Sequence, residues 1–179
     1  MRAHHALTCS TRSELDTEDP ATNAKLVELL HQKIPGKYTT STHEPVRTSE
    51  AAAAVRGATL ASGAKAMLLS TKSSGGPDAF VLVVISASAK MDSKKLKLAA
   101  GVKSTRFATE VEVLSITGCM PGAVPPFGSL WGLTTYMDNS LQEQGEEINF
   151  NAGLRTFSVQ MPLRDYLNIE APIIVAVTG

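Results

Sequence analysis

AKAMLLST at residues 64–71 and AFVLVVIS at residues 79–86 are two apolar runs of strand length, and they decide the fold. Residues 72–78 between them read KSSGGPD, where the glycines and the proline indicate a turn. Short apolar runs bounded by turn residues are typical of strands buried in a sheet. We therefore predict that residues 64–86 form a hairpin at the centre of a sheet.

Helices and further strands are predicted on both sides of this hairpin. Capping residues and apolar positions at helical spacing predict helices at residues 20–34, 49–57, 92–101, 109–116 and 163–168. Runs of strand-forming residues predict strands at residues 38–43, 105–108, 133–137, 147–151, 156–160 and 173–177. Residues 118–132 hold four glycines and three prolines, too many for a helix or a central strand, so we predict an ordered loop there.

The order of these elements limits the fold class. Strands and short helices alternate along the chain, yet crossover helices are too few for a sheet of parallel strands only. We expect an α/β or α+β fold in which helices surround a mixed, mainly antiparallel sheet.

Length and composition bound the domain organisation. A chain of 179 residues with 43% apolar residues fits one domain with one core. Residues 1–19 lack the apolar stretch of a secretory signal, and the chain has no run of roughly 20 apolar residues that could form a membrane span. We predict a disordered tail over residues 1–19 and one domain over residues 20–179, in the cytoplasm and with no membrane partner.

Cysteine and histidine positions offer little metal chemistry. Cys9 and Cys119 lie far apart and form neither a disulfide framework nor a CxxC spacing, and only His31 and His43 lie outside the tail. This leaves no recognisable ligand set for a metal-dependent hydrolase. The motifs GxSxG, HExxH, GxGxxG and Walker A are also absent from the sequence. We expect neither a metal nor another cofactor.

The formal charges balance at 17 basic and 17 acidic side chains, which excludes a polycation that binds nucleic acid along its whole length. A local basic stretch, opposed there only by Asp92, consists of Lys90, Lys94, Lys95, Lys97, Lys103 and Arg106. Such a stretch is either a solvated helix face or a local surface for nucleic acid, and the pattern leaves both interpretations open.

Three segments could carry chemistry. Lys65 begins the first central strand, where it is either an exposed strand-end lysine or an ammonium at a pocket rim that holds a phosphate or an oxyanion. Residues 118–128, GCMPGAVPPFG, combine glycines that expose N–H groups with prolines that fix the loop, so they either cradle a small acyl group or form a structural turn. Residues 149–153, NFNAG, allow close approach by a ligand or form a bulge.

In their order and spacing, these segments resemble the YbaK/ProX family, which is related to the editing insertion of bacterial prolyl-tRNA synthetase. The resemblance covers about residues 20–175. The matching segments are THEP at 42–45, SEAA at 49–52, GAKA at 63–66, TGC at 117–119, GAVPPFG at 122–128, FNAG at 150–153 and DYL at 165–167.

The resemblance implies which residues form the site. It places Lys65 in the editing pocket beside a GxxxP loop, so the predicted catalytic residues are Lys65, Gly122 and Pro126. The predicted substrate-binding residues are His43, Ala123, Val124, Phe127 and Gly153. Phe127 and Met120 either shape the pocket wall or anchor the core. The predicted contacts to the tRNA backbone are Lys90, Lys94, Lys95 and Lys97.

The resemblance also implies the reaction. A water would hydrolyse the ester between a wrong amino acid and the terminal adenosine of a tRNA, with tRNA groups assisting and no covalent enzyme intermediate. The segments 117–119 and 122–128 are closer to free-standing members that act on small amino acids attached to proline tRNA, so alanine is the predicted acyl group. The expected partners are mischarged tRNA and a prolyl-tRNA synthetase or synthetase complex. The alternative is a noncatalytic module that binds aminoacyl-tRNA or serves as an adaptor of a synthetase complex.

Overall fold

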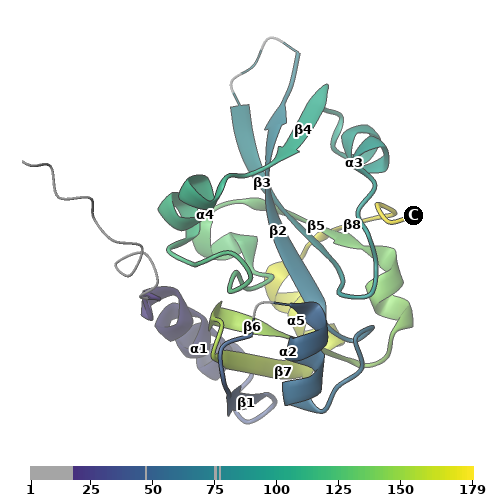
Figure 1. Cartoon of the computed structure of the whole chain (residues 1–179). Coiled ribbons are helices and arrows are strands. Elements are labelled where there is room, and N and C mark those ends of the chain that lie inside the picture. The colour runs from purple at the N-terminus through teal and green to yellow at the C-terminus, as the bar shows by residue number, and fades with distance from the viewer. Residues whose placement is uncertain (1–17, 47, 75, 77) are drawn as a thin grey trace, which may run out of the picture.

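Two β-sheets organise the chain (Figure 1). The computed structural model describes residues 18–46, 48–74, 76 and 78–179. Within these residues the strands form a five-stranded sheet in the order β4-β2-β3-β5-β8 and a three-stranded sheet in the order β1-β7-β6. Most of the predicted tail, residues 1–17, lies outside the described residues. Glu18, which the prediction assigned to the tail, is tied to the domain because its carboxylate accepts a hydrogen bond from Arg155 Nε at 2.9 Å.

The elements have the following bounds. The helices are α1 (Ala21–Lys33), α2 (Ser49–Arg56), α3 (Ser93–Ala100), α4 (Glu110–Thr117) and α5 (Leu163–Glu170), with 3-10 turns η2 (Gly128–Trp131) and η3 (Asn139–Glu143). The strands are β1 (Thr39–Thr42), β2 (Ala64–Lys72), β3 (Asp78–Ser86), β4 (Ser104–Phe107), β5 (Thr134–Asp138), β6 (Glu147–Leu154), β7 (Phe157–Pro162) and β8 (Ile173–Val175).

The predicted hairpin forms the middle of the larger sheet. β2 and β3 pair antiparallel, from Ala64 opposite Ser86 to Lys72 opposite Asp78. Alternate residues of a strand point to opposite faces of its sheet, and apolar clusters cover both faces of β3. Residues 81–86 are therefore all buried, which explains why this segment is continuously apolar rather than alternating.

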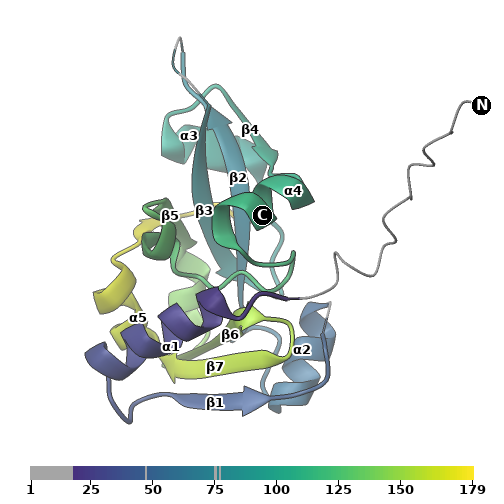
Figure 2. The ribbon, with the colours of Figure 1, turned by 90° about the vertical axis from the view of Figure 1, so that its left-hand side faces the viewer.

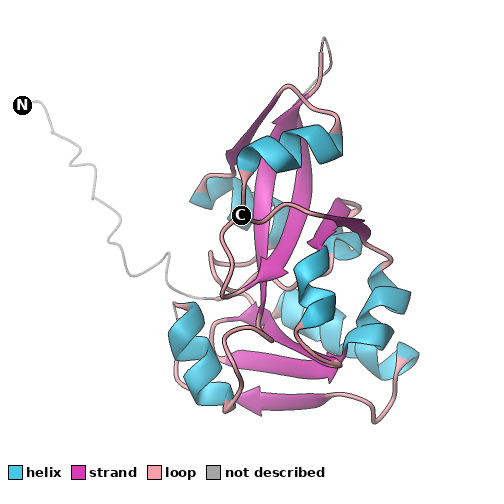
Figure 3. Cartoon of the chain, turned by 90° about the vertical axis from the view of Figure 1, so that its right-hand side faces the viewer, coloured by secondary structure: helices cyan, strands magenta, loops and turns pink. Residues whose placement is uncertain are grey.

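α3 covers one face of the larger sheet (Figure 3). Asp92 caps this helix as predicted, because its carboxylate accepts the N–H of Lys94 at 2.7 Å. Leu96 in the middle of α3 is fully buried in an apolar cluster with Val83 of β3 and Val177 near the C-terminus. Lys94 and Lys95 on the remaining face of α3 are exposed to solvent, and Lys97 is half-buried.

α1 packs against the smaller sheet, in which β7 lies between β1 and β6 (Figure 2). Leu26 and Leu30 of this helix are fully buried. Gly153 permits the close approach: its φ is +88°, and a Cβ at this position would lie 2.7 Å from the backbone nitrogen of Asn23. A register shift in β6 between Asn151 and Leu154 accompanies this contact. The small residues at the end of β6 thus form a bulge that accommodates a helix.

The predicted fold class is confirmed. Four strand pairs are antiparallel, while β3-β5 and β5-β8 are parallel. The strands are divided between two sheets rather than gathered in one, because apolar patterns identify strands but not their partners. The first helix begins one residue later than predicted: Pro20 is its N-cap, and Asp19 accepts the N–H of Ala21 at 2.8 Å. Across the described ranges, no helix has both the length and the apolar character needed to cross a membrane.

Candidate functional site

A small pocket lies where the two sheets meet. Gly63, just before β2, forms a parallel bridge with Asn149 of β6, whose N–H donates to the Ser62 carbonyl at 3.1 Å. The pocket beside this junction measures about 140 Å³ and is lined by α2, the start of β2, the loop after α4 and Asn151 of β6. None of the described residues that line it is Asp, Glu, His or Cys. Its small side chains include Ala52, Ala53, Ala64, Ala66 and Ala87.

Lys65 lies on the wall that β2 contributes. Its side chain is half-buried, and its Nζ donates to the carbonyl of Ala89, just after β3, at 3.1 Å. In the described part of the chain, no carboxylate pairs with this ammonium. The positive charge of this lining residue is therefore not compensated by a carboxylate of the described residues.

The loop after α4 supplies another wall through Gly122 and Val124. Gly122 has a φ of +88°, and a Cβ there would meet nothing within 4 Å, so the glycine is needed for backbone shape rather than for space. The N–H of Ala123 donates to the Met120 carbonyl at 2.9 Å. The N–H groups of Gly122 and Val124 donate to no acceptor among the described residues. Two residues of the pocket lining thus each keep a backbone N–H without an acceptor among the described residues.

Three other predicted site residues of this loop lie outside the pocket lining. Ala123 and Phe127 are fully buried in the core. The Phe127 ring meets the rings of Phe150 and Tyr166 edge-on, with centroids 5.7 and 5.2 Å apart. Pro126 accepts the Tyr166 hydroxyl through its carbonyl at 2.9 Å, and burial raises the pKa of that hydroxyl. Of the two interpretations of Phe127, the structure therefore favours the core anchor, which fixes one end of the loop.

Gly153 and His43 also lie outside the pocket lining. The space beside Gly153 is filled by the backbone of α1, so the close approach there is made by a helix and not by a ligand. The His43 Nδ1 lies 2.8 Å from the Glu44 carbonyl, so in the neutral ring Nδ1 carries the proton. Its Nε2 then accepts the Ser158 hydroxyl at 2.7 Å. Both ring nitrogens of His43 are therefore occupied by contacts within the protein.

Arg56, the last residue of α2, lines the pocket although the sequence analysis did not single it out. Its guanidinium donates to Ser158 Oγ at 2.8 Å, Asn149 Oδ1 at 2.9 Å and Asn151 Oδ1 at 2.6 Å. All three acceptors are neutral, and no carboxylate of the described residues pairs with it. Burial lowers the pKa of Arg56 to about 10, so the group stays charged at neutral pH. In the sequence it is only a basic residue before Gly57, a pattern that gives no sign of this role.

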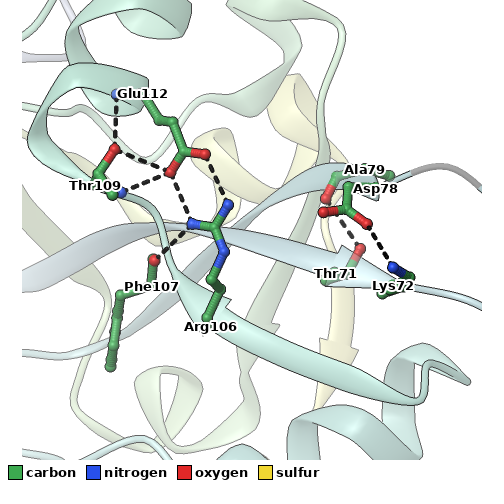
Figure 4. Close-up of polar contacts among 8 residues, drawn as sticks. All are labelled: Thr71, Lys72, Asp78, Ala79, Arg106, Phe107, Thr109 and Glu112. Carbon is green, nitrogen blue, oxygen red and sulfur yellow. Dashed lines mark hydrogen bonds and ion pairs between the residues drawn. The ribbon is translucent and has the colours of Figure 1, made fainter.

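The predicted tRNA-backbone lysines lie on α3 and in the turn before it, and none of them lines the pocket. We call this set the α3 lysine surface; it consists of Lys90, Lys94, Lys95 and Lys97. All but Lys97, which is half-buried, are exposed, and Lys95 Nζ donates to the Thr178 carbonyl at 2.5 Å. Arg106, at the end of the same basic stretch, donates to both carboxylate oxygens of Glu112 at 2.7 and 2.8 Å, which neutralises its charge (Figure 4).

Among the described residues, the remaining titratable groups do not suggest a nucleophile or a metal centre. Cys119 is buried, and burial raises the pKa of its thiol, whereas reactive cysteines have a lowered pKa. Among the residues that the structure describes, no group of three or more His, Cys, Asp or Glu side chains could hold a metal ion.

A comparison with models of known protein families shows to which family the chain with this pocket belongs. The family model described as the aminoacyl-tRNA editing domain matches residues 43–169, a span that contains the whole pocket lining. The chain belongs to the aminoacyl-tRNA editing domain family. The family predicted from the sequence segments is thereby confirmed, and so is the predicted activity class, an aminoacyl-tRNA deacylase.

Individual relatives agree with this assignment. Two curated proteins, from Escherichia coli strain K12 and from Escherichia coli O157:H7, are each 36% identical to the editing domain over 154 residues, which is 86% of this chain and 91% of theirs. Both carry the name multifunctional Ser/Thr-tRNA deacylase ProXp-y.

Solved structures share the fold. A putative trans-editing enzyme for prolyl tRNA synthetase matches with a TM-score of 0.76 at 21% identity, covering 91% of this chain and 99% of its own. The hypothetical protein APE2540 matches with a TM-score of 0.73 at 21% identity, covering 86% and 99%.

Proposed function

We propose that this editing domain hydrolyses the ester of tRNA mischarged with a small amino acid and acts as a free-standing enzyme. The observation that carries the proposal is one small pocket that joins Lys65 on β2 with the Gly122 loop. An ester bound there would be within reach of an ammonium and of two backbone N–H groups at once. Hydrolysis of an activated ester depends mainly on such positioning.

The size of the pocket favours a small acyl group. Pockets for drug-sized ligands measure roughly 300 to 1,000 Å³, whereas this one measures about 140 Å³. It has room for an amino-acid side chain, while the terminal adenosine would lie over its rim. The sequence prediction is alanine on proline tRNA. Thr48 and Ser49 add hydroxyls to the lining, and Thr48 accepts the Ala51 N–H at 3.2 Å, which leaves its own O–H free to donate. This supports serine and threonine as further substrates, as does the name of the Escherichia coli relatives.

In the proposed reaction a water attacks the ester carbonyl, and the bond to the ribose oxygen then breaks. The amino acid and the free 3′ end of the tRNA are the products. The N–H groups of Gly122 and Val124 stabilise the charge that develops on the carbonyl oxygen, and Lys65 holds the 3′-terminal phosphate or ribose. As the family resemblance implies, tRNA hydroxyls and water carry the proton transfers and no covalent enzyme intermediate forms. The described lining, which has no His, Cys, Asp or Glu, agrees with this.

Binding of the tRNA body is assigned to the α3 lysine surface, which contacts phosphates of the acceptor stem. A chain with balanced charge gains little affinity from long-range attraction to a polyanion. A prolyl-tRNA synthetase or a synthetase complex that releases the mischarged tRNA nearby would compensate for weak binding. This partner is part of the proposal.

The test is single-turnover deacylation of proline tRNA charged with alanine, serine, threonine or proline. We expect hydrolysis of alanyl- and seryl-tRNA to be at least about 10-fold faster than that of prolyl-tRNA, since a single methylene alters discrimination by roughly 10- to 200-fold. Binding of these tRNAs without hydrolysis of any ester would reject the proposal in favour of the noncatalytic module.

A further inference from the structure

Arg56 connects the two segments that carry the proposed chemistry. Its guanidinium reaches from the end of α2 to three oxygens on one face of the smaller sheet. Asn149 and Asn151 are two positions apart in β6 and therefore share a face, and Ser158 of β7 lies opposite Asn151. The three donor–acceptor distances lie between 2.6 and 2.9 Å. This is a planar fork of donors that matches a prearranged set of acceptors.

These contacts determine how the two asparagine amides are oriented. A guanidinium only donates hydrogen bonds, so both amides must turn their oxygens toward Arg56. Their NH₂ groups then point the other way and become donors. Asn151 Nδ2 donates to the Gly122 carbonyl at 2.8 Å, and Asn149 Nδ2 donates to Ser62 Oγ at 2.9 Å. One amide thus holds the loop, and the other holds the residues that lead into β2.

The charge on Arg56 strengthens the hydrogen bonds that set this orientation. Hydrogen bonds from an ionised donor are roughly twice as strong as neutral ones. None of its acceptors carries a negative charge, and no acidic side chain of the described residues contacts it. The half-buried guanidinium therefore donates only to neutral groups, and two of these, Asn151 and Asn149, lead to Gly122 and to Ser62.

We infer that Arg56 is a positioning residue for deacylation. Through Asn149 and Asn151 it fixes the start of β2 and the Gly122 loop relative to each other, and hence the separation between Lys65 and the loop N–H donors. The inference rests on the proposed function, because only a reaction in this pocket requires that separation. Misplacing reacting groups by about 1 Å can reduce a rate by roughly 100-fold.

Two variants test the inference. Arg56→Met keeps an unbranched apolar stem but removes every donor, and Arg56→Lys keeps the charge but offers one nitrogen in place of a fork. We expect the maximal single-turnover rate on small aminoacyl esters to fall by roughly 10- to 100-fold in both variants. The tRNA concentration for half-maximal rate should change by less than about 3-fold, because the interactions that bind the ground state and the transition state equally are largely retained. Arg164→Met, an exposed arginine on α5, is the matched control and should keep the parental values.

Hydrogen exchange, measured well below the melting temperature, provides a readout that does not depend on activity. In Arg56→Met, residues 58–66 and 118–128 should both exchange faster, while the rest of the chain and the Arg164→Met control stay at parental rates. A parental deacylation rate in the Arg56 variants would overturn the inference. Faster exchange throughout the chain would also overturn it, since the effect would then be general destabilisation.

The same experiment separates failure of the inference from failure of the proposed function. If the parent protein hydrolyses none of the esters, the proposed function fails and exchange alone decides the inference. Faster hydrogen exchange confined to residues 58–66 and 118–128 then supports the positioning role of Arg56. Unchanged exchange in either segment overturns it.

Discussion

The two ends of strand β2 hold positive charge in opposite ways. At its start, Lys65 and the nearby Arg56 donate only to neutral oxygens. At its other end, two cations are paired with carboxylates (Figure 4): Lys72 lies 3.9 Å from Asp78, and Arg106 lies 2.7 Å from Glu112. Correspondingly, burial lowers the pKa of Arg56 to about 10, whereas the hydrogen bonds to Glu112 raise that of Arg106.

If the proposed function holds, the pairing of a cation, rather than the number of basic residues, distinguishes the end of β2 that is available to a polyanion. The chain as a whole is neutral, and the two cation–carboxylate pairs at the far end of β2 carry no net charge either. The pocket end has two cations and no acid in the described lining, and Lys65 is the one that we propose to hold a phosphate or ribose of the tRNA. Exposed pairs such as Lys72–Asp78 contribute little to stability, which makes the far end a good internal control.

The largest effect is expected from Lys65→Ala, which removes one of the unpaired cations. Loss of a charge-assisted hydrogen bond in the transition state should cost about 2 to 4 kcal/mol, which is roughly 30- to 1,000-fold in single-turnover rate. Lys65→Arg should restore the rate only in part, because a planar fork does not occupy the volume of a compact ammonium. The measurement is hydrolysis of alanyl- and seryl-tRNA, with melting temperature as the folding control.

Lys72→Ala is the matched control for this prediction, since it removes a lysine from the same strand at the paired end. It should deacylate at the parental rate. Equal losses of deacylation rate in the two variants would mean that a substitution at either end of β2 lowers the rate. The contrast between the two ends would then not hold. A parental rate in a folded Lys65→Ala protein would remove this residue from the mechanism.

A smaller effect is expected on tRNA affinity when the α3 lysine surface is neutralised by four Lys→Gln substitutions. Each tRNA phosphate that no longer meets a lysine should reduce the slope of log affinity against log salt by roughly 0.7 to 0.9, so four such phosphates account for about 3. The rate in the pocket at saturating tRNA should persist. The measurement is a binding titration at several salt concentrations.

The control for the lysine surface replaces exposed lysines on and after α1, namely Lys25, Lys33 and Lys37. This control should leave the salt dependence unchanged. If both sets of substitutions flatten the slope equally for each charge removed, attraction is nonspecific. If neither changes it, the α3 lysine surface is only a solvated helix face.

The smallest effect is expected from Glu112→Gln at the paired end. Hydrogen bonds from Arg106 and Thr109 lower the pKa of Glu112 from 4.5 to about 2. Because the folded state lowers this pKa, its contribution to stability is present above about pH 4.5 and is lost as the pH falls toward 2. In Glu112→Gln the loss of stability across this pH range should be shallower than in the parent. Urea unfolding at several pH values measures it.

Glu110→Gln neutralises a carboxylate in the same first turn of α4 and serves as the control. It should follow the parental pH dependence more closely than Glu112→Gln does. A parental pH profile in Glu112→Gln would show that the pairing at this end of β2 does not affect folding, and the contrast with the pocket end would then rest on the kinetic variants alone.

Much of the fold could be predicted because its signals are local. The hairpin of β2 and β3, the helix caps at Asp92 and Thr109, and the loop after α4 all follow from residues within a few positions of one another. The division of the strands between two sheets was not predicted, since no local pattern names the partner of a strand.

The candidate site was predictable only in part. The family resemblance identified Lys65 and Gly122, which the structure brings to one pocket. It also named Phe127 and Gly153, which serve the core and the approach of α1. A glycine or an aromatic residue in a loop has the same appearance in a sequence whether a ligand or another part of the chain fills the space beside it.

The strands and helices could be located from the sequence alone, because burial periodicity, capping and turn residues act over a few positions, and the family was indicated separately by the resemblance of short segments to known proteins. Only the tertiary structure decided which cations remain unpaired and which residues link the pocket walls. The acceptors of Arg56 lie 93 to 102 positions further along the chain. Hydrogen bonds of a long polar side chain depend on where folding places distant acceptors, and no local pattern encodes that arrangement.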